Sequence, residues 1–185
     1  MGRPKPLLDL GGKPALARIL EACKGAALSR ALVVLGRDAL EVRKAVDPAL
    51  ADLVVNPVPE RGMTSSLQEG LAHLPPDARG FLLFPADYPL VTWKELVQLE
   101  EAFEHDHRHL IYIPTFEGKR GHPVACDRRI AEEILALESH EPAHLVIRKD
   151  PARVKEVPVK NPWVARDLDT LEDAIAARST LSENP

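Results

Sequence analysis

The segment GFLLFPADYPL, residues 80–90, decides the fold because it joins a buried strand to a polar turn. Its first five residues are typical of a strand that is covered on both faces of a parallel sheet. Asp87 follows that strand, and Pro89 keeps the preceding backbone extended. Ligands bind beyond the carboxyl ends of the strands in such sheets, so Asp87 is a candidate ligand for Mg²⁺. The alternative is that Asp87 only starts the turn before the next helix.

Similar apolar runs recur on both sides of this segment, and stretches of helical period separate them. The alternation predicts right-handed strand–helix–strand units and a mostly parallel sheet. We therefore expect residues 1–185 to form a single domain with a three-layer α/β fold. The expected strands are residues 31–35, 53–55, 80–84 and 110–114, and the expected helices are residues 13–27, 38–46, 63–74 and 92–106.

The pattern changes after residue 114, where a loop or hairpin is expected around Gly118 and Gly121. Helices are expected over residues 129–137 and 142–149, strands over residues 154–159 and 164–168, and a last helix to about residue 178.

Composition argues against several classes of protein. The chain has 185 residues and a formal net charge of −4, which disfavours binding of nucleic acid through a broad basic surface. No apolar run approaches the roughly 18 residues that a membrane span needs, so we expect no membrane association. The chain has 2 cysteines, too few for a disulfide framework, which favours the reducing cytoplasm.

Charged residues outside the central segment form two further candidate sites. Asp167 and Asp169 alternate along an extended stretch, so both carboxylates lie on one face and could complete a metal site with Asp87. Alternatively, they only cap the following helix. Arg3 and Lys5 could clamp a polyphosphate, or could belong to a solvated N-terminus.

Two loops have residues suited to anions. Residues 56–66 end at a helix start with small hydroxyl residues, where backbone N–H groups could accept an anion or a ribose. Residues 119–123 form a basic loop that could grip an anionic second substrate. Each segment is equally compatible with a plain solvated loop.

Taken together, five segments resemble the motifs of the MobA-like nucleotidyltransferases. The match is closer to the molybdopterin cytidylyltransferase branch, which has Pro-Lys where the guanylyltransferases usually have Asp-Lys. In that family a first strand and a glycine-rich loop precede the Met-Gly that opens this sequence, so we expect both to be missing from the chain as given. The five segments are MGRPKPLLDLGGKP (residues 1–14), NPVPERGMTSSL (56–67), ADYPLV (86–91), RGHP (120–123) and DLDTLED (167–173).

The resemblance implies a Rossmann-like nucleotidyltransferase fold and Mg²⁺-dependent transfer of CMP or GMP from CTP or GTP to the phosphate of molybdopterin, with release of pyrophosphate. It implies that Lys5, Arg3 and Asp87 are catalytic, with Mg²⁺ held by Asp87 and Asp169 and, more weakly, by Asp167. The nucleotide-binding residues that it implies are Gly2, Lys5, Asn56, Gly62, Ser65 and Asp87. Arg120 and His122 would bind the acceptor.

Other functions fit the same residues. The chain could be a cytidylyltransferase for a sugar phosphate or an isoprenoid phosphate, or a non-catalytic nucleotide-binding relative. Under the leading interpretation, molybdoenzymes or their chaperones are the expected protein partners.

Overall fold

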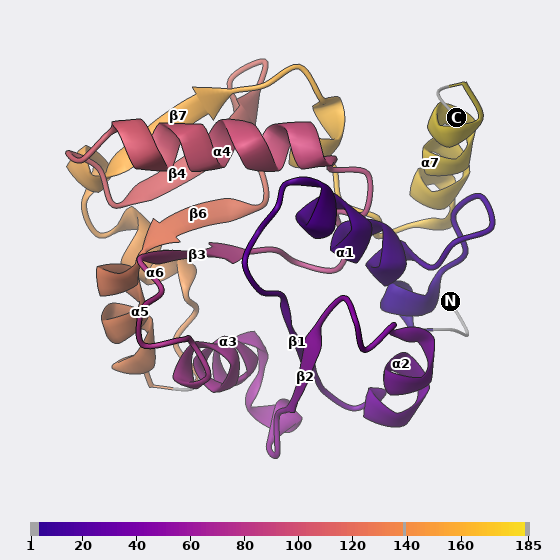
Figure 1. The fold of residues 1–185 in the computed structure, drawn as a ribbon, viewed down its shortest axis with the longest axis horizontal. Coiled ribbons are helices and arrows are strands. Elements are labelled where there is room, and N and C mark those ends of the chain that lie inside the picture. Colours follow the sequence, from indigo (N-terminus) through magenta and orange to yellow (C-terminus); the bar gives the residue numbers. More distant parts are fainter. Residues whose placement is uncertain (1–3, 139, 184–185) are drawn as a thin grey trace.

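The computed structural model describes residues 4–138 and 140–183, shown in Figure 1. Helices and strands alternate along the first two thirds of the chain, as predicted. The helices are α1 (Ala15–Gly25), α2 (Ala39–Ala45), α3 (Met63–Ala72), α4 (Trp93–His105), α5 (Arg128–Leu135), α6 (His144–Arg148) and α7 (Leu171–Glu183). The strands are β1 (Leu32–Leu35), β2 (Asp52–Val55), β3 (Gly80–Leu83), β4 (Ile111–Phe116), β5 (Lys119–Arg120), β6 (Val124–Asp127) and β7 (Val154–Pro158).

The described strands form two sheets. β1 and β2 pair in parallel, and the larger sheet has the order β3-β6-β4, with β5 and β7 also paired to β4. β7 runs parallel to β4, whereas β6 is antiparallel to both β3 and β4, so β3, β4 and β7 share one direction. The predicted α/β fold with a parallel sheet is therefore confirmed.

Strand β6 is an addition to the sequence prediction, which left residues 115–125 as a loop or hairpin. The hairpin is present, because β5 pairs with the end of β4. β6 follows it directly, and its three apolar residues come immediately after the loop residues, with no turn of their own to mark the start of a strand. It becomes a buried strand because both of its edges are paired, one with β3 and the other with β4.

Alternate side chains of the larger sheet face two separate cores, which gives the fold its layers. Ile111 and Ile113 of β4 pack with Ile130 of α5 on one face. Tyr112, between them, packs with Leu99 of α4 on the other face. In Figure 1, α4 accordingly lies on the side of the sheet opposite to α5 and α6. The three-layer prediction is confirmed for this part of the chain.

The N-terminal segment packs against the C-terminal helix. Leu10, Leu168 and Ala177 belong to one buried cluster, although the first precedes α1 and the last lies in α7. The Arg178 guanidinium adds two hydrogen bonds to the Asp9 carbonyl, at 3.1 and 2.8 Å. Figure 1 shows α7 beside the indigo segment that precedes α1. Segments from the two ends of the sequence are therefore held together.

The predicted strand over residues 164–168 is wrong. Residues Pro162–Ala165 form a 3₁₀ turn. The Asn161 side chain caps its start by accepting a hydrogen bond from the Trp163 N–H at 3.0 Å. Proline at the start of the turn has its φ fixed near the helical value, and Trp163 and Val164 are buried by the turn itself. Arg166 after the turn is extended, and no described strand pairs with residues 166–168.

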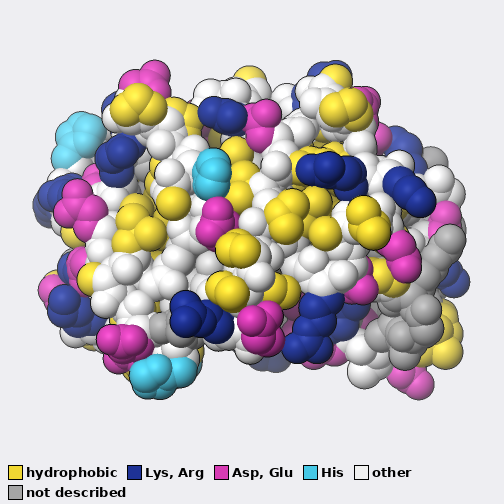
Figure 2. Space-filling model, turned by 90° about the horizontal axis from the view of Figure 1, so that it is seen from below, with side chains coloured by type: hydrophobic (Ala, Val, Ile, Leu, Met, Phe, Trp, Pro, Cys, Tyr) yellow, Lys and Arg dark blue, Asp and Glu magenta, His cyan; other side chains and the backbone are white. Residues whose placement is uncertain are grey.

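The surface carries both signs of charge. On the face shown in Figure 2, Lys and Arg side chains are interspersed with Asp and Glu side chains and with small apolar patches. No helix in the described part of the chain is long and apolar enough to cross a bilayer. Cys23 and Cys126 are both free thiols.

Candidate functional site

Asp87 lies in a tight turn immediately beyond strand β3. The turn is closed by hydrogen bonds from the Tyr88 N–H to the Pro85 carbonyl and from the Val91 N–H to the Tyr88 carbonyl, both 3.3 Å long. Val91 is buried, and the Asn161 amide donates to the Leu90 carbonyl at 3.0 Å, so the far end of the turn is fixed. The Asp87 carboxyl is therefore presented beyond the end of β3, where the sequence predicted it, by a turn whose far end is fixed.

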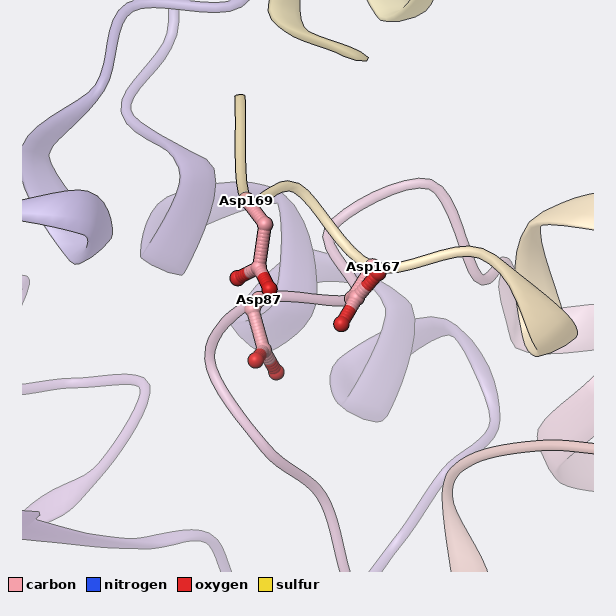
Figure 3. Close-up of side chains that lie close together, drawn as sticks. All are labelled: Asp87, Asp167 and Asp169. Atoms are coloured by element: carbon pink, nitrogen blue, oxygen red, sulfur yellow. The ribbon is translucent and has the colours of Figure 1, made fainter.

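Asp167 and Asp169 reach the same place from the other end of the chain. The backbone N–H of Leu168, which lies between them, donates to the Asp87 carbonyl at 2.9 Å. The Leu168 side chain is buried, and the side chains on either side of it both reach towards Asp87. One ligand oxygen of each carboxylate lies within 4.8 Å of the others. Figure 3 shows the three side chains converging from the two segments.

Lys5 supplies positive charge to this group of acids. It begins the 3₁₀ turn Lys5–Leu7, which is anchored by Leu7 in the core with β1 and by Leu8 in the core with α7. Its ammonium forms an ion pair with Asp169. The hydrogen bond to Asp169 raises the pKa of Lys5, and the charges of Asp87 and Asp167 act in the same direction. Lys5 is therefore protonated and lies in the field of all three carboxylates.

Two aromatic rings border the acids. The rings of Tyr88 and His122 are 4.8 Å apart between centroids and tilted by 53°. Burial raises the pKa of the Tyr88 phenol to about 12, and the nearby aspartates add to the shift. Burial lowers the pKa of His122 although Asp87 and Asp167 oppose the change, so the imidazole is neutral at pH 7. Sequence reasoning assigned no role to Tyr88, and its place in the motif after Asp87 is the only signal that could have found it.

The loop of residues 56–66 is organised by a buried asparagine. Asn56 follows β2, and its amide nitrogen donates to the hydroxyls of Ser65 and Ser66, at 2.9 Å each. Its oxygen accepts the Val58 N–H at 2.9 Å, and the Ser65 hydroxyl donates to the Gly62 carbonyl at 2.8 Å. The side chains of Asn56 and Ser65 are thus used inside the loop, and they position it.

Gly62 ends this loop and precedes the first residue of helix α3. Its φ of +96° lies in the region that favours glycine, and no side chain in the described part of the chain caps the helix start. The first N–H groups of α3 therefore remain available to an acceptor.

The remaining predicted residues divide into two groups. Arg120 lies on β5, where its guanidinium donates to Glu156 of β7 at 2.8 Å. His122 lies against Tyr88, beside the acids, so the two predicted acceptor-binding residues have different surroundings. Gly2 and Arg3 lie outside the described residues.

The three acids suit a hard divalent cation. One oxygen of Asp87, Oδ1, is buried and has no hydrogen-bond partner among the described residues. A buried oxygen without a partner is costly unless something binds to it. Carboxylate oxygens are the ligands that Mg²⁺ and Mn²⁺ prefer, and one or two carboxylates are enough when substrate phosphates supply the other ligands. The group therefore fits a divalent ion bound together with a phosphorylated ligand.

The fold is shared with solved structures. Rv0371c from Mycobacterium tuberculosis is 26% identical, with a TM-score of 0.85 over 97% of this chain and 90% of that chain. A complex of Rv0371c with manganese, also 26% identical, has a TM-score of 0.82 over 96% of this chain and 93% of that one. Molybdopterin-guanine dinucleotide biosynthesis protein A from Archaeoglobus fulgidus is 18% identical and shares the fold, with a TM-score of 0.71 over 98% of this chain and 92% of that chain.

Sequence comparison points in the same direction. The bifunctional protein GlmU of Chromobacterium violaceum is 34% identical over 100 residues, which are 54% of this chain and 21% of GlmU. The match therefore spans about a fifth of the length of that relative. The model of the MobA-like NTP transferase domain matches residues 1–155, most of the chain. The chain belongs to the MobA-like NTP transferase family.

Proposed function

We propose that this chain is a Mg²⁺-dependent nucleotidyltransferase that transfers CMP or GMP from CTP or GTP to the terminal phosphate of molybdopterin. An acceptor phosphate oxygen attacks the α-phosphorus of the nucleotide and forms a new P–O bond. The bond from the α-phosphorus to the oxygen that bridges to the β-phosphate breaks, and pyrophosphate leaves. Membership of the MobA-like family supports the reaction class. The motif resemblance to the molybdopterin branch supports the acceptor.

The observation that carries the proposal is the convergence of Asp87, Asp167 and Asp169 with Lys5 at the end of β3. The nucleophile of this reaction is already an anion, so the site needs no strong base. It must instead hold the two reactants in line and neutralise the triphosphate. A protonated lysine and a set of carboxylates for a divalent ion are the groups that this task requires.

Each residue then has a distinct task. Bound Mg²⁺ would neutralise phosphate oxygens and orient the triphosphate. Asp87 and Asp169 would hold the ion, with Asp167 as a weaker third carboxylate. The Lys5 ammonium stabilises negative charge that develops on the leaving phosphates.

The loop of residues 56–66 orients the nucleotide in this proposal. Asn56 and Ser65 fix the loop from inside, so its exposed backbone is the part that is free to bind. Gly62 leaves the start of α3 open, where N–H groups favour a negatively charged ligand.

The neutral His122 imidazole lies beside Asp87 and provides a nitrogen for the acceptor. Its Nδ1 atom is buried and has no hydrogen-bond partner in the described part of the chain. Arg120 can reach an anionic acceptor only by leaving Glu156. Because molybdopterin is handed on to its enzymes, molybdoenzymes or their chaperones are the proposed protein partners.

Pyrophosphate release from each nucleotide with each acceptor class tests the proposal. We expect release with CTP or GTP and molybdopterin in Mg²⁺, and none in EDTA. Release with a sugar phosphate or an isoprenoid phosphate instead would replace the acceptor but keep the reaction class. Nucleotide binding without turnover under any of these conditions would indicate a non-catalytic relative.

Asp87→Asn provides the residue-level control for this assay. It removes the charge but keeps the size, so we expect a loss of turnover of at least about a hundredfold with little change in folding. Asp77→Asn is the matched variant, because Asp77 is an exposed aspartate in the turn before β3. Equal activity of the Asp87 and Asp77 variants would remove Asp87 from the site.

A further inference from the structure

The Lys5 ammonium lies at the carboxylates that a divalent cation would need. Its ammonium is paired with Asp169, and the charges of Asp87 and Asp167 act on it as well. Among the ion pairs of the described residues, this is the only one that any of the three aspartates makes. The site thus already has an internal cation before any ligand binds.

Two cations cannot share this group without cost. The ligand oxygens lie within 4.8 Å of one another, so an ion bound to them would lie close to an ammonium that stays on Asp169. Like charges at such separations repel, and solvent only partly screens the repulsion, because the Lys5 and Asp169 side chains are 44% and 56% exposed. An arriving metal ion must therefore displace the Lys5 ammonium or bind beside it weakly.

A displaced ammonium needs a new anionic partner. The three aspartates would then bind the metal ion instead of the ammonium. The Lys5 side chain is 44% exposed, so it has room to turn away from Asp169. Triphosphate oxygens bound to the same metal ion offer that partner at the same place. Either ligand alone leaves a charge without a partner. If only the metal ion binds, the displaced Lys5 ammonium has no anionic partner. If only the triphosphate binds to Lys5, the three aspartates have no cation.

We propose that Lys5 is the counter-ion of the aspartates in the free protein, and that the divalent ion and the triphosphate therefore bind as a pair. This inference rests on the proposed function and concerns the form of its substrate. Lys5 favours the metal–nucleotide complex over either component. Only the complex supplies both a cation that replaces Lys5 at the aspartates and phosphate oxygens that pair with the displaced ammonium. The coupling is a difference in affinity between two ligand states of one site.

Binding of Mn²⁺ alone, followed by electron paramagnetic resonance of the free ion, tests the proposal without any turnover. We expect Lys5→Met to bind Mn²⁺ at least about tenfold more tightly than the unaltered chain, because the competing cation is gone. Lys5→Arg keeps the charge and should bind Mn²⁺ as weakly as the unaltered chain. Lys24→Met is the matched control, since Lys24 is an exposed lysine at the end of α1 and should change nothing.

Equal Mn²⁺ affinity in Lys5→Met, Lys24→Met and the unaltered chain would overturn the proposal. Lys5→Gln is a second neutral variant with the same expected result, and circular dichroism of each variant shows whether it is folded. The measurement stands apart from the proposed reaction. A chain that never releases pyrophosphate but gains Mn²⁺ affinity on loss of Lys5 would contradict the reaction alone. A chain that turns over but shows no such gain would contradict the role of Lys5 alone.

Discussion

Several residues near the nucleotide loop act through hydrogen bonds that lie inside the protein. Asn56 is 3% exposed, and its side chain bonds to Ser65, Ser66 and the Val58 N–H. All three partners belong to the loop or the first turn of α3. The motif indicates Asn56 as a nucleotide contact, but its side chain instead fixes the conformation of the loop of residues 56–66.

Asn56→Ala should lower both stability and nucleotide affinity. It removes the acceptor of the part-buried Val58 N–H and the amide that donates to the Ser65 and Ser66 hydroxyls, which costs about 1–3 kcal/mol in the free energy of unfolding. We expect a KM for the nucleotide that rises more than the turnover rate falls, because the loop loses its fixed conformation. Urea denaturation and steady-state kinetics measure the two effects. Gln98→Ala, an exposed change on α4, should stay within about 0.5 kcal/mol.

An unchanged unfolding free energy for Asn56→Ala would show that the buried network contributes nothing. A change in stability with an unchanged KM would separate the network from nucleotide binding.

At the scale of elements, Asp106 joins the end of α4 to the larger sheet. Its carboxyl pairs with Lys155 of β7 at 2.9 Å and accepts hydrogen bonds from the Arg108 N–H and the His109 ring, each also 2.9 Å. The Tyr112 hydroxyl of β4 donates to the Asp106 carbonyl. The hydrogen bond from Lys155, with those from Arg108 and His109, holds the pKa of Asp106 well below its usual value of 3.8.

This pKa shift predicts an acid-dependent loss of stability. A carboxyl whose pKa is lower in the folded state stabilises the fold at every pH above 3.8, and the contribution disappears as the pH falls through the folded-state value. We expect Asp106→Asn to be less stable than the unaltered chain at pH 7. The difference should shrink steadily below pH 4. Urea denaturation at a series of pH values measures it, and a difference that stays constant from pH 7 to pH 3 would contradict this account.

The contact between α7 and the N-terminal segment positions the two parts of the site. Lys5 precedes that contact and Asp169 precedes α7, so the ion pair between them depends on how α7 sits. Arg178 makes the polar part of the contact through the Asp9 carbonyl. The apolar part is the cluster around Leu10 and Ala177.

Arg178→Ala should weaken this contact at a distance from the reacting atoms. Loss of its two hydrogen bonds costs about 1–2 kcal/mol. We expect a lower rate of pyrophosphate release, with partial recovery in Arg178→Lys, which can restore one hydrogen bond. Thermal melts and single-turnover rates are the measurements. A rate equal to that of the unaltered chain in a variant of lowered stability would mean that α7 is only structural.

Across the whole molecule, the spacing of apolar residues predicted those strands and helices whose own sequence has a clear strand or helix period. The expected strand over residues 80–84 and the expected helix over residues 92–106 are examples. The structure has β3 and α4 there, and a capping box between Thr92 and Glu95 starts α4. Local pattern did not predict β6, whose burial depends on partners distant in sequence. It also mistook residues 164–168 for a strand, because apolar residues buried by a 3₁₀ turn resemble a short apolar run.

The same distinction holds for the candidate site. The three aspartates could be predicted because they follow the ends of recognisable segments and alternate along the chain. The ion pair between Lys5 and Asp169 joins residues 164 positions apart, and no local pattern reports such a distance. The hydrogen bonds of Asn56 inside its loop and the tilted contact between the Tyr88 and His122 rings likewise exist only after the chain has folded.

The central claim is that Asp87, Asp169 and Lys5 form a shared site for a divalent ion and a triphosphate. A crystal structure of the chain with Mn²⁺ and a non-hydrolysable CTP or GTP analogue, with anomalous data at the manganese edge, tests it most directly. The account predicts an anomalous peak in contact with the carboxylates of Asp87 and Asp169, with the Lys5 ammonium moved from Asp169 to a phosphate oxygen. A peak away from these carboxylates, or a bound nucleotide with Lys5 still paired to Asp169, would contradict it.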